Sequence, residues 1–290
     1  MTDQIGFIGL GAMGSAVAAR LASRADLMVT DARGSAVAAM AALGGRPATQ
    51  QEIARDCDIV FLSLPRSQDV QQVLDGPAGL AATMRPGGVV VDMTTGDPRL
   101  DEAFAARLAA RGIDFADAPV SGGPQAAAAG TLAILVGAAE DTKQRLWPVL
   151  ELISDRVLHV GGVGAGHVVK LVNNMLSAAN RMAAREAVAI AVRSGVDART
   201  CIEAINSSSG RSYITESTYP RFLLDGPARP QDFRLSLMLK DVKLALGLAE
   251  HAGLEASIGS ATCELLARGV ATLGEQADIN EFMDIPAGPR

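Results

Sequence analysis

The chain has few aromatic residues and no concentration of positive charge. Aromatic residues make up 3% of its 290 residues, and the formal net charge is -6 with no basic run. Proteins that bind nucleic acid need a basic surface, often with aromatic side chains on which bases stack, so we set that class of function aside. No apolar stretch reaches the roughly 18 uncharged residues that a membrane-spanning helix needs, so we expect no membrane partner.

Cysteine and histidine are equally sparse. The three cysteines, Cys57, Cys201 and Cys263, are widely spaced and form no CxxC pair, which is typical of a protein from a reducing compartment. The N-terminal residues MTDQIGFIGL lack the basic and apolar regions of a signal peptide, so we expect a cytoplasmic protein. The three histidines show no metal-ligand spacing, and we expect no metal site.

Short apolar runs alternate with Ala-rich amphipathic stretches in the first half of the chain. These runs cover residues 5–10, 27–31, 58–64, 88–93, 113–118 and 131–137. Continuous apolar strands separated by helices are typical of βαβ units with a buried parallel sheet. Because such crossovers are right-handed, we expect an α/β fold with a doubly wound, mostly parallel sheet of the Rossmann type.

The pattern changes after residue 162, where the glycine-rich segment 161–166 interrupts the chain. Helical periodicity then covers about 167–194, 234–251 and 257–273, and no strand-like run returns. A chain of this length suits about two domains. We therefore expect a dinucleotide-binding domain over 1–162 and an all-helical substrate and dimerisation domain over 163–290, connected by the first long helix.

A glycine-rich turn directly follows the first expected strand and opens a helix. It consists of Gly9, Leu10, Gly11, Ala12, Met13 and Gly14. In a GxGxxG turn the first glycine permits the tight turn, the second lets the backbone approach a pyrophosphate, and the third allows close packing of helix and strand. The pyrophosphate would then lie at a helix N-terminus. The turn therefore predicts a dinucleotide site, with a turn that binds nothing as the alternative.

The residues that follow the other expected strands fill in this cofactor site. Asp31 ends the second strand at the spacing of a ribose-binding acid. Its carboxylate would repel a 2′-phosphate, which favours NAD. Arg33 would receive such a phosphate or be a solvated loop cation, so NADP stays the alternative. We also assign Leu64 and Pro65, at the end of the third run, to the cofactor site.

A second candidate site follows the strand 113–118, in the sequence DAPVSGG (117–123). The hydroxyl of Ser121 and the backbone N–H groups of Gly122 and Gly123 would form a compact anion nest for a substrate carboxylate. Ligands of open α/β sheets bind beyond the carboxyl ends of the strands, although a strand-exit loop would have a similar composition. At the same edge, Thr95 would meet the nicotinamide end of the cofactor or cap the next helix.

A polar stripe runs along the first long helix. It consists of His167, Lys170, Asn174, Ser177 and Arg181. The stripe would be the wet face of a surface helix or would line a groove between the domains. In a groove, desolvation and a neighbouring cation, for which Lys240 is a candidate, would favour the neutral amine of Lys170. Such a lysine can act as a general base or acid.

Four motifs in order give the chain a resemblance to a known family. They are FIGLGAMG (7–14), DAPVSGG (117–123), GAGHVVKLVNN (164–174) and LKDVKLAL (239–246). The chain resembles the β-hydroxyacid dehydrogenases, which include 3-hydroxyisobutyrate dehydrogenases and tartronate semialdehyde reductases. The motifs span most of the chain, and DAPVSGG followed by GxxxKxxNN is much more specific than GxGxxG.

The resemblance implies a Rossmann domain, a helical domain and an active site between them. It implies that Lys170 is the general acid/base, that Asn174 holds the substrate, that segment 121–123 binds the substrate carboxylate, and that Lys240 lies near cofactor and substrate. The implied reaction is the reversible NAD(P)-dependent oxidation of a small β-hydroxy acid to its semialdehyde, by a homodimer or homotetramer.

Other functions stay open at this stage. A non-catalytic dinucleotide-binding or sensing module would keep the glycine-rich turn and not need Lys170. A family member acting on another hydroxy acid, such as threonate or serine, would share every motif. Decarboxylating dehydrogenases of the 6-phosphogluconate type carry a much larger helical domain, and imine reductases usually replace the lysine.

Overall fold

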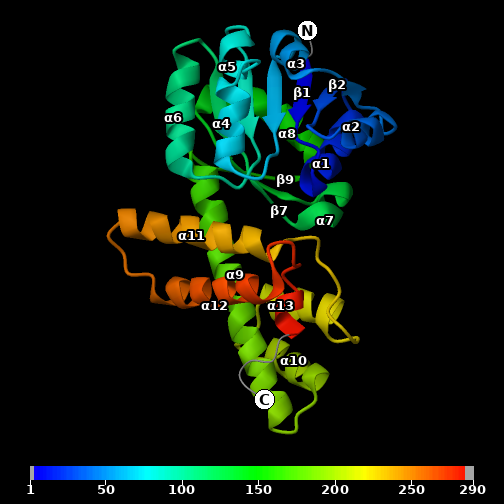
Figure 1. The fold of residues 1–290 in the computed structure, drawn as a ribbon, viewed down its shortest axis with the longest axis vertical. Helices are drawn as coiled ribbons and strands as arrows, with labels where there is room; N and C mark the ends of the chain where they lie inside the picture. Colours follow the sequence, from blue (N-terminus) through cyan, green and yellow to red (C-terminus); the bar gives the residue numbers. More distant parts are fainter. Residues whose placement is uncertain (1–2, 285–290) are drawn as a thin grey trace. The chain divides into compact units, whose positions relative to one another are not determined.

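The computed structural model describes residues 3–284. The chain divides into two compact units, Met1–Lys170 and Leu171–Arg290, which are coloured from blue to green and from green to red in Figure 1. The helix α9 (Ala165–Arg193) begins in the first unit and continues through the second.

The first unit contains one nine-stranded sheet. Its strands are β1 (Ile5–Ile8), β2 (Leu27–Thr30), β3 (Arg46–Pro47), β4 (Ile59–Leu62), β5 (Val89–Asp92), β6 (Asp114–Asp117), β7 (Val120–Ser121), β8 (Ala133–Gly137) and β9 (Arg156–Gly161). The strand order is β3-β2-β1-β4-β5-β6-β8-β7, and β9 pairs with β8. The pairings from β3 through β6 are all parallel. The expected Rossmann architecture is therefore confirmed.

The far end of the sheet departs from the predicted pattern. Strand β8 runs antiparallel to β6 and β7 and parallel to β9. The apolar runs had not indicated β3, β7 or β9. Two of these strands are only two residues long, and β9 has no fully buried residue, with half of its residues exposed. A strand of two residues, or one that is partly exposed, has no continuous apolar run in its sequence, and such runs are the signal from which buried strands are predicted.

Helices cover both faces of the sheet (Figure 1). One face packs against α1 (Ala12–Ala22), α2 (Gly34–Ala41), α7 (Gly123–Ala129) and α8 (Glu140–Ile153). The other packs against α3 (Gln50–Asp56), α4 (Ser67–Asp75), α5 (Leu80–Thr83) and α6 (Pro98–Ala109). In β4, Phe61 enters the first core while Val60 and Leu62 enter the second. Burial on both faces explains why the central strands are continuously apolar.

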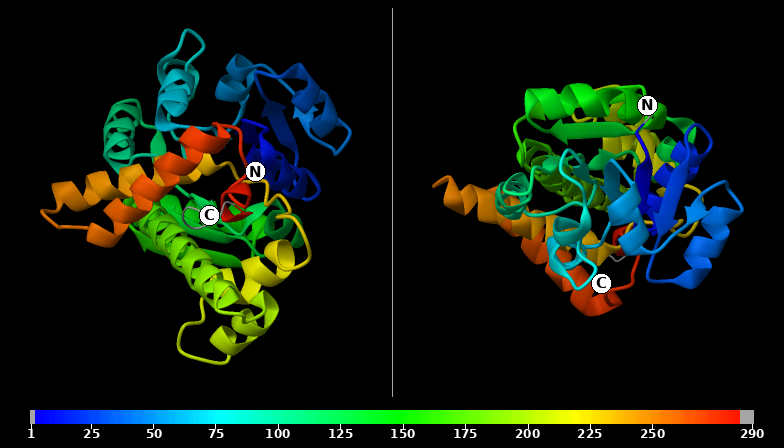
Figure 2. Two further views of the ribbon diagram at one scale, coloured as in Figure 1. Left: turned by 60° about the horizontal axis from the view of Figure 1, so that its bottom comes forward. Right: turned by 90° about the horizontal axis from the view of Figure 1, so that it is seen from above.

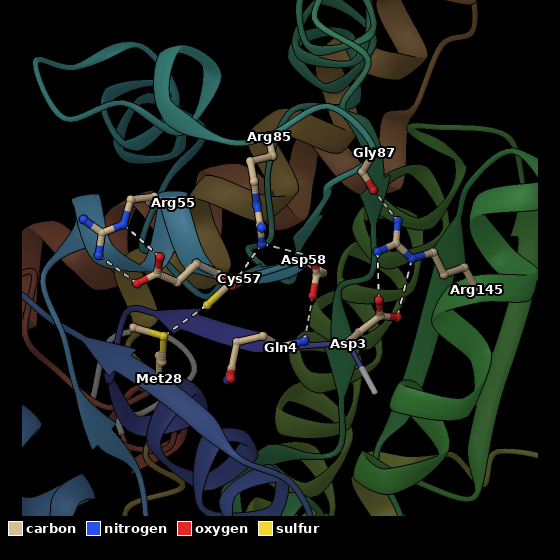
Figure 3. A network of polar contacts seen from close by, with 10 residues as sticks. Asp3, Gln4, Met28, Arg55, Cys57, Asp58, Arg85, Gly87 and Arg145 are labelled. Carbon is tan, nitrogen blue, oxygen red and sulfur yellow. Dashed lines mark hydrogen bonds and ion pairs between the residues drawn. The ribbon is translucent and has the colours of Figure 1, made fainter. Parts of the chain in front are cut away.

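A polar network joins the amino ends of the strands (Figure 3). The backbone N–H of Gln4 donates to Asp58 Oδ2 over 2.9 Å, which connects the starts of β1 and β4. Arg145 pairs with Asp3 at 3.0 Å and donates to the carbonyl oxygen of Gly87, just before β5. These polar contacts hold the starts of β1, β4 and β5 together.

The second unit is built from helices. Besides the continuation of α9, these are α10 (Ala198–Asn206), the π-helix η1 (Ile214–Leu223), α11 (Leu235–His251), α12 (Ser257–Leu273) and α13 (Glu281–Asp284). Helices α11 and α12 lie side by side in Figures 1 and 2. The long helices agree with the predicted ranges, whereas α10, η1 and α13 were not predicted. Among residues 3–284, no helix is long and apolar enough to cross a membrane.

A buried arginine holds the second unit together. Arg181 of α9 is 2% exposed and donates to Asn280 Oδ1 over 2.6 Å and to Gln231 Oε1 over 2.9 Å. Asn280 in turn donates to the carbonyl of Arg229 over 2.9 Å. Burial lowers the pKa of Arg181 to about 10. The guanidinium therefore ties α9 to the segments that precede α11 and α13.

Replacing this arginine should destabilise the protein. Arg181→Leu should lower the free energy of unfolding by about 3 kcal/mol, because two charge-assisted hydrogen bonds are lost and their buried acceptors lose a partner. Urea unfolding would measure the change. Arg193→Leu, at an exposed position of the same helix, is the matched control. Equal unfolding curves for the two variants would contradict the structural role of Arg181.

Candidate active site

The predicted cofactor residues gather at the carboxyl edge of the sheet. Gly9 follows β1, Asp31 follows β2, Leu64 follows β4 and Thr95 follows β5. Because these strands are parallel neighbours, their ends lie along one edge. Open α/β sheets bind their ligands at this edge.

The three glycines of the turn differ in what surrounds them. Gly9 has φ +100°, and a Cβ there would lie 2.3 Å from the carbonyl oxygen of Ser63. A Cβ on Gly14 would lie 2.0 Å from the carbonyl oxygen of Gly9. A Cβ on Gly11 would meet nothing within 4 Å. Gly11 is the N-cap residue of α1, which has no side-chain cap. Internal packing therefore requires two of the glycines, and the space beside the third fits a pyrophosphate at the helix N-terminus.

Asp31 is fixed between the turn and Arg33. Its Oδ2 accepts the backbone N–H of Leu10 over 2.6 Å, and its Oδ1 accepts the backbone N–H and Nε of Arg33 over 2.8 and 3.0 Å. Arg33 also donates to the carbonyl of Leu10 over 2.9 Å. Burial pulls the pKa of Asp31 upward, but the hydrogen bonds from Arg33 and Leu10 outweigh it and hold that pKa below its ordinary value. A carboxylate anion therefore stands at the end of β2.

The predicted anion nest adopts a conformation that requires glycine. Ser121 belongs to β7, where it pairs with Ala133 of β8. Gly122 and Gly123 follow with φ +134° and +77°, in the left-handed half of backbone space. A Cβ on Gly122 would lie 2.7 Å from Ala126 Cβ, whereas one on Gly123 would meet nothing within 4 Å. A side chain at position 123 would thus meet open space, and it is the positive φ that favours glycine there.

The polar stripe of α9 is not its wet face. Lys170 and Asn174 are buried, as are His167 and Arg181 at the two ends of the stripe, and Ser177 is half-buried. Large apolar residues of the same helix are exposed instead. They are Val168, Val172, Leu176, Ile190 and Val192. The helix therefore turns its polar stripe inward, which the sequence alone had left open.

In the second unit, Asn174 and Lys240 meet at a carboxylate that sequence reasoning missed. The amide of Asn174 donates to Asp241 Oδ2 over 2.7 Å. Lys240 Nζ lies 3.0 Å from Asp241 Oδ1. Asp241 is 2% exposed and lies among Met238, Val242 and Ala245 on the buried face of α11. A signal existed, because an acid at an apolar position of a helix needs a buried partner.

In the first unit, His167 lies among three buried aspartates. Its Nδ1 pairs with Asp101 of α6, and its Nε2 contacts the carbonyl oxygen of Thr94. Its backbone N–H donates to Asp117 Oδ2 at the end of β6 over 2.7 Å. Asp92, the last residue of β5, accepts the backbone N–H of Thr94 over 2.8 Å. Sequence reasoning had placed His167 in the stripe but had given no role to these aspartates.

The charge state of the ring follows from its partners. A carbonyl oxygen only accepts, so Nε2 of His167 must carry a proton. Burial alone would lower the pKa of His167, but Asp101, Asp92 and Asp117 outweigh it and raise that pKa to about 9. Asp92, Asp101 and His167 are close enough to hold a metal ion. Nε2 is occupied by the Thr94 carbonyl, and the raised pKa of the ring favours an ion pair between Nδ1 and Asp101.

Two glycine variants should separate binding from folding. Gly11→Ala should change the free energy of unfolding of the free protein by less than about 0.5 kcal/mol, because its Cβ would face open space. The same variant should weaken dinucleotide binding at least about tenfold, or 1.4 kcal/mol. Gly14→Ala should instead lower the unfolding midpoint without cofactor. Calorimetric titration and thermal unfolding check both, and unchanged binding in Gly11→Ala would contradict the assignment of the turn.

Comparisons with known proteins agree with this geometry. The family model described as the NAD binding domain of 6-phosphogluconate dehydrogenase matches residues 4–161. The model described as NAD-binding of NADP-dependent 3-hydroxyisobutyrate dehydrogenase matches residues 164–285. Together the two models cover nearly the whole chain, and both describe NAD(P)-dependent dehydrogenases, which supports the expected NAD(P) cofactor.

Individual relatives extend over most of the chain. It is 40% identical over 257 residues to 2-(hydroxymethyl)glutarate dehydrogenase of Eubacterium barkeri, covering 88% of this chain and 84% of that protein. It is 33% identical over 285 residues to 3-hydroxyisobutyrate dehydrogenase of Pseudomonas aeruginosa, covering 96% and 94%. A structure of Mycobacterium tuberculosis 3-hydroxyisobutyrate dehydrogenase with L-serine superposes with a TM-score of 0.89 at 28% identity, covering 99% and 100%. The chain belongs to the β-hydroxyacid dehydrogenase family of NAD(P)-dependent oxidoreductases, which act on CH–OH groups.

Proposed function

We propose that the protein reversibly oxidises a small β-hydroxy acid to its semialdehyde, with NAD in preference to NADP and with Lys170 as the general acid/base. The observation that carries the proposal is the burial of Lys170 and Asn174, one helical turn apart, on the inward face of α9. A buried ammonium is costly unless it serves a partner or a reaction.

Each residue then has a task. Lys170 Nζ accepts the proton of the substrate hydroxyl during oxidation and returns it during reduction. Asn174, whose amide is held by Asp241, orients the substrate relative to Nζ. The hydroxyl of Ser121 and the backbone at Gly122 and Gly123 bind the substrate carboxylate. NAD(P), when bound, supplies the hydride acceptor.

The preference for NAD rests on Asp31. Asp31 directly follows β2, where the fold leads us to expect the ribose of the adenosine half, and its carboxylate would repel a 2′-phosphate. Arg33, which the alternative requires as a phosphate receptor, is already paired with Asp31 and the Leu10 carbonyl. This pairing favours NAD.

The proposal includes a homodimer or homotetramer and a cytoplasmic location. Val168, Val172 and Leu176, spaced four residues apart on α9, form an exposed apolar strip that self-association would cover. Cys57, Cys201 and Cys263 are free thiols, in keeping with a reducing compartment.

Removing the proposed proton carrier should abolish most turnover. Lys170→Ala should lower kcat by about 10²–10⁴-fold, the usual contribution of a positioned acid/base. Its Kd for NAD should stay within about threefold, or 0.7 kcal/mol. Initial rates and calorimetric titration measure the two effects, with Lys243→Ala, at an exposed position of α11, as the control. Wild-type kcat in a folded Lys170→Ala variant would exclude Lys170 as the acid/base.

A single substitution should shift the cofactor preference. Asp31→Ser keeps a hydrogen-bond acceptor for Leu10 but removes the negative charge and releases Arg33. The ratio of kcat/KM for NADP to that for NAD should rise at least about tenfold, or 1.4 kcal/mol. Adding Arg33→Ala should cancel the gain. An unchanged ratio in Asp31→Ser would place the discrimination elsewhere.

A further inference from the structure

His167 has no part in the proton transfer proposed above, yet it is completely buried. It lies one helical turn before Lys170 on α9, inside the same compact unit. Its two ring nitrogens are occupied by Asp101 on one side and by the carbonyl of Thr94 on the other. The side chain therefore connects the helix that carries Lys170 to the turn between β5 and α6.

The turn between β5 and α6 is fixed by hydrogen bonds to the carbonyl, the N–H and the hydroxyl of Thr94. The Thr94 carbonyl contacts His167 Nε2, its N–H donates to Asp92 over 2.8 Å, and its hydroxyl accepts the N–H of Leu64 over 3.1 Å. The next residue, Thr95, is the one predicted to face the nicotinamide end of the cofactor. The position of Thr95 thus depends on the groups that hold Thr94.

The imidazole also packs directly against the backbone of the turn. A Cβ on Gly96 would lie 3.3 Å from His167 Cε1 and 2.6 Å from Ser67 Oγ. Ser67 Oγ accepts the backbone N–H of Asp97 over 2.8 Å. Glycine at position 96 lets the ring approach the turn as closely as it does, so the distance between α9 and the turn is set by direct contact.

The His167–Asp101 pair is not needed to cap either helix. Asp117 already accepts the N–H groups of Gly164 and His167 at the start of α9. Asp97 already caps α6 by accepting the N–H of Arg99 over 3.1 Å. A buried ion pair contributes little net stability compared with apolar residues of the same volume. What His167 and Asp101 add is a fixed distance between two elements.

The charges around the ring come from each packed element. Asp92 faces it from β5, Asp101 from α6, Asp97 from the N-cap of α6, and Asp117 from β6. These negative groups favour a doubly protonated ring, which is the form that can donate from both nitrogens at once.

We infer that His167 and Asp101 are positioning residues of the dehydrogenase: the pair fixes the Thr94–Gly96 turn, and with it the nicotinamide end of the cofactor, relative to Lys170. The inference rests on the proposed function. Neither residue touches the reacting atoms in it, and both act through the turn and the helix that they join.

Kinetics of two Asp101 variants test the inference. Asp101→Leu removes the acceptor and should lower kcat by about 10- to 100-fold, since small misplacements at a reaction centre cost this much. Its Kd for NAD should stay within about threefold. Asp101→Asn should recover kcat to within about threefold of wild type, because the amide can donate to Nδ1 of a neutral ring while Nε2 still donates to Thr94.

Ser154→Ala, which removes a buried hydroxyl bonded to the Gly130 and Leu132 carbonyls, is the control for destabilisation alone and should leave kcat unchanged.

Nitrogen NMR of histidine-labelled protein gives a readout independent of turnover. The wild-type His167 ring should remain doubly protonated at neutral pH and lose its charge only near its pKa of about 9. Asp101→Asn should shift this loss to lower pH, because the nearest negative charge is gone. The chain contains only three histidines, so Gln substitution of each in turn assigns the resonances.

Each outcome is decisive. A rescued kcat in Asp101→Asn together with a charged ring in the wild type supports the positioning role. A folded Asp101→Leu variant with wild-type kcat, or an Asp101→Asn variant no more active than Asp101→Leu, overturns it. A wild-type protein that turns over no β-hydroxy acid overturns the proposed function, and the positioning role with it, even where the NMR titration shows the pair intact.

Discussion

The capping of α9 by Asp117 is the interaction on which the active site depends. One carboxylate, at the end of β6, accepts the backbone N–H groups of Gly164 and His167 over 2.6 and 2.7 Å. A Cβ on Gly137 or Gly166 would lie 2.3 or 2.6 Å from its oxygens, so only glycine leaves room for it. Burial raises the pKa of Asp117 to about 6. The start of the helix that carries Lys170 is thereby fixed to the end of the sheet.

This constraint explains how one helix can serve two tasks. The first turns of α9 belong to the Rossmann unit, where His167 is enclosed by aspartates and the β5–α6 turn. The continuation builds the helical unit, where Asn174 bonds to Asp241. Because α9 is unbroken between them, the orientation of Lys170 relative to Asn174 is set by helical geometry alone.

Much of the fold could be predicted from the sequence, because strands that are buried on both faces of a sheet consist of continuous apolar runs. The edge strand β9 and the π-helix η1 could not be predicted, since a half-exposed strand and an irregular helix show no regular spacing of apolar residues. For the candidate site, the glycine-rich turn and Asp31 were readable because their spacing follows from phosphate and ribose binding. The role of Asp101 was not, because its partner His167 lies far away along the chain and only folding brings the two together. Asp241 carried a signal, as an acid at an apolar helix position, but the sequence did not identify Asn174 as its partner. The inward orientation of the α9 stripe likewise depends on tertiary packing.

Initial rates on the wild-type protein test the account most directly. NAD and NADP would be crossed with pairs of isomeric acids, each pair offering the hydroxyl at the β or the α carbon. The account predicts turnover of at least one β-hydroxy acid, faster with NAD, and none of its α-hydroxy isomer, since the carboxylate nest and Lys170 would address a hydroxyl one carbon further away. Tight NAD binding without turnover of any β-hydroxy acid would contradict the account and favour a dinucleotide-sensing module.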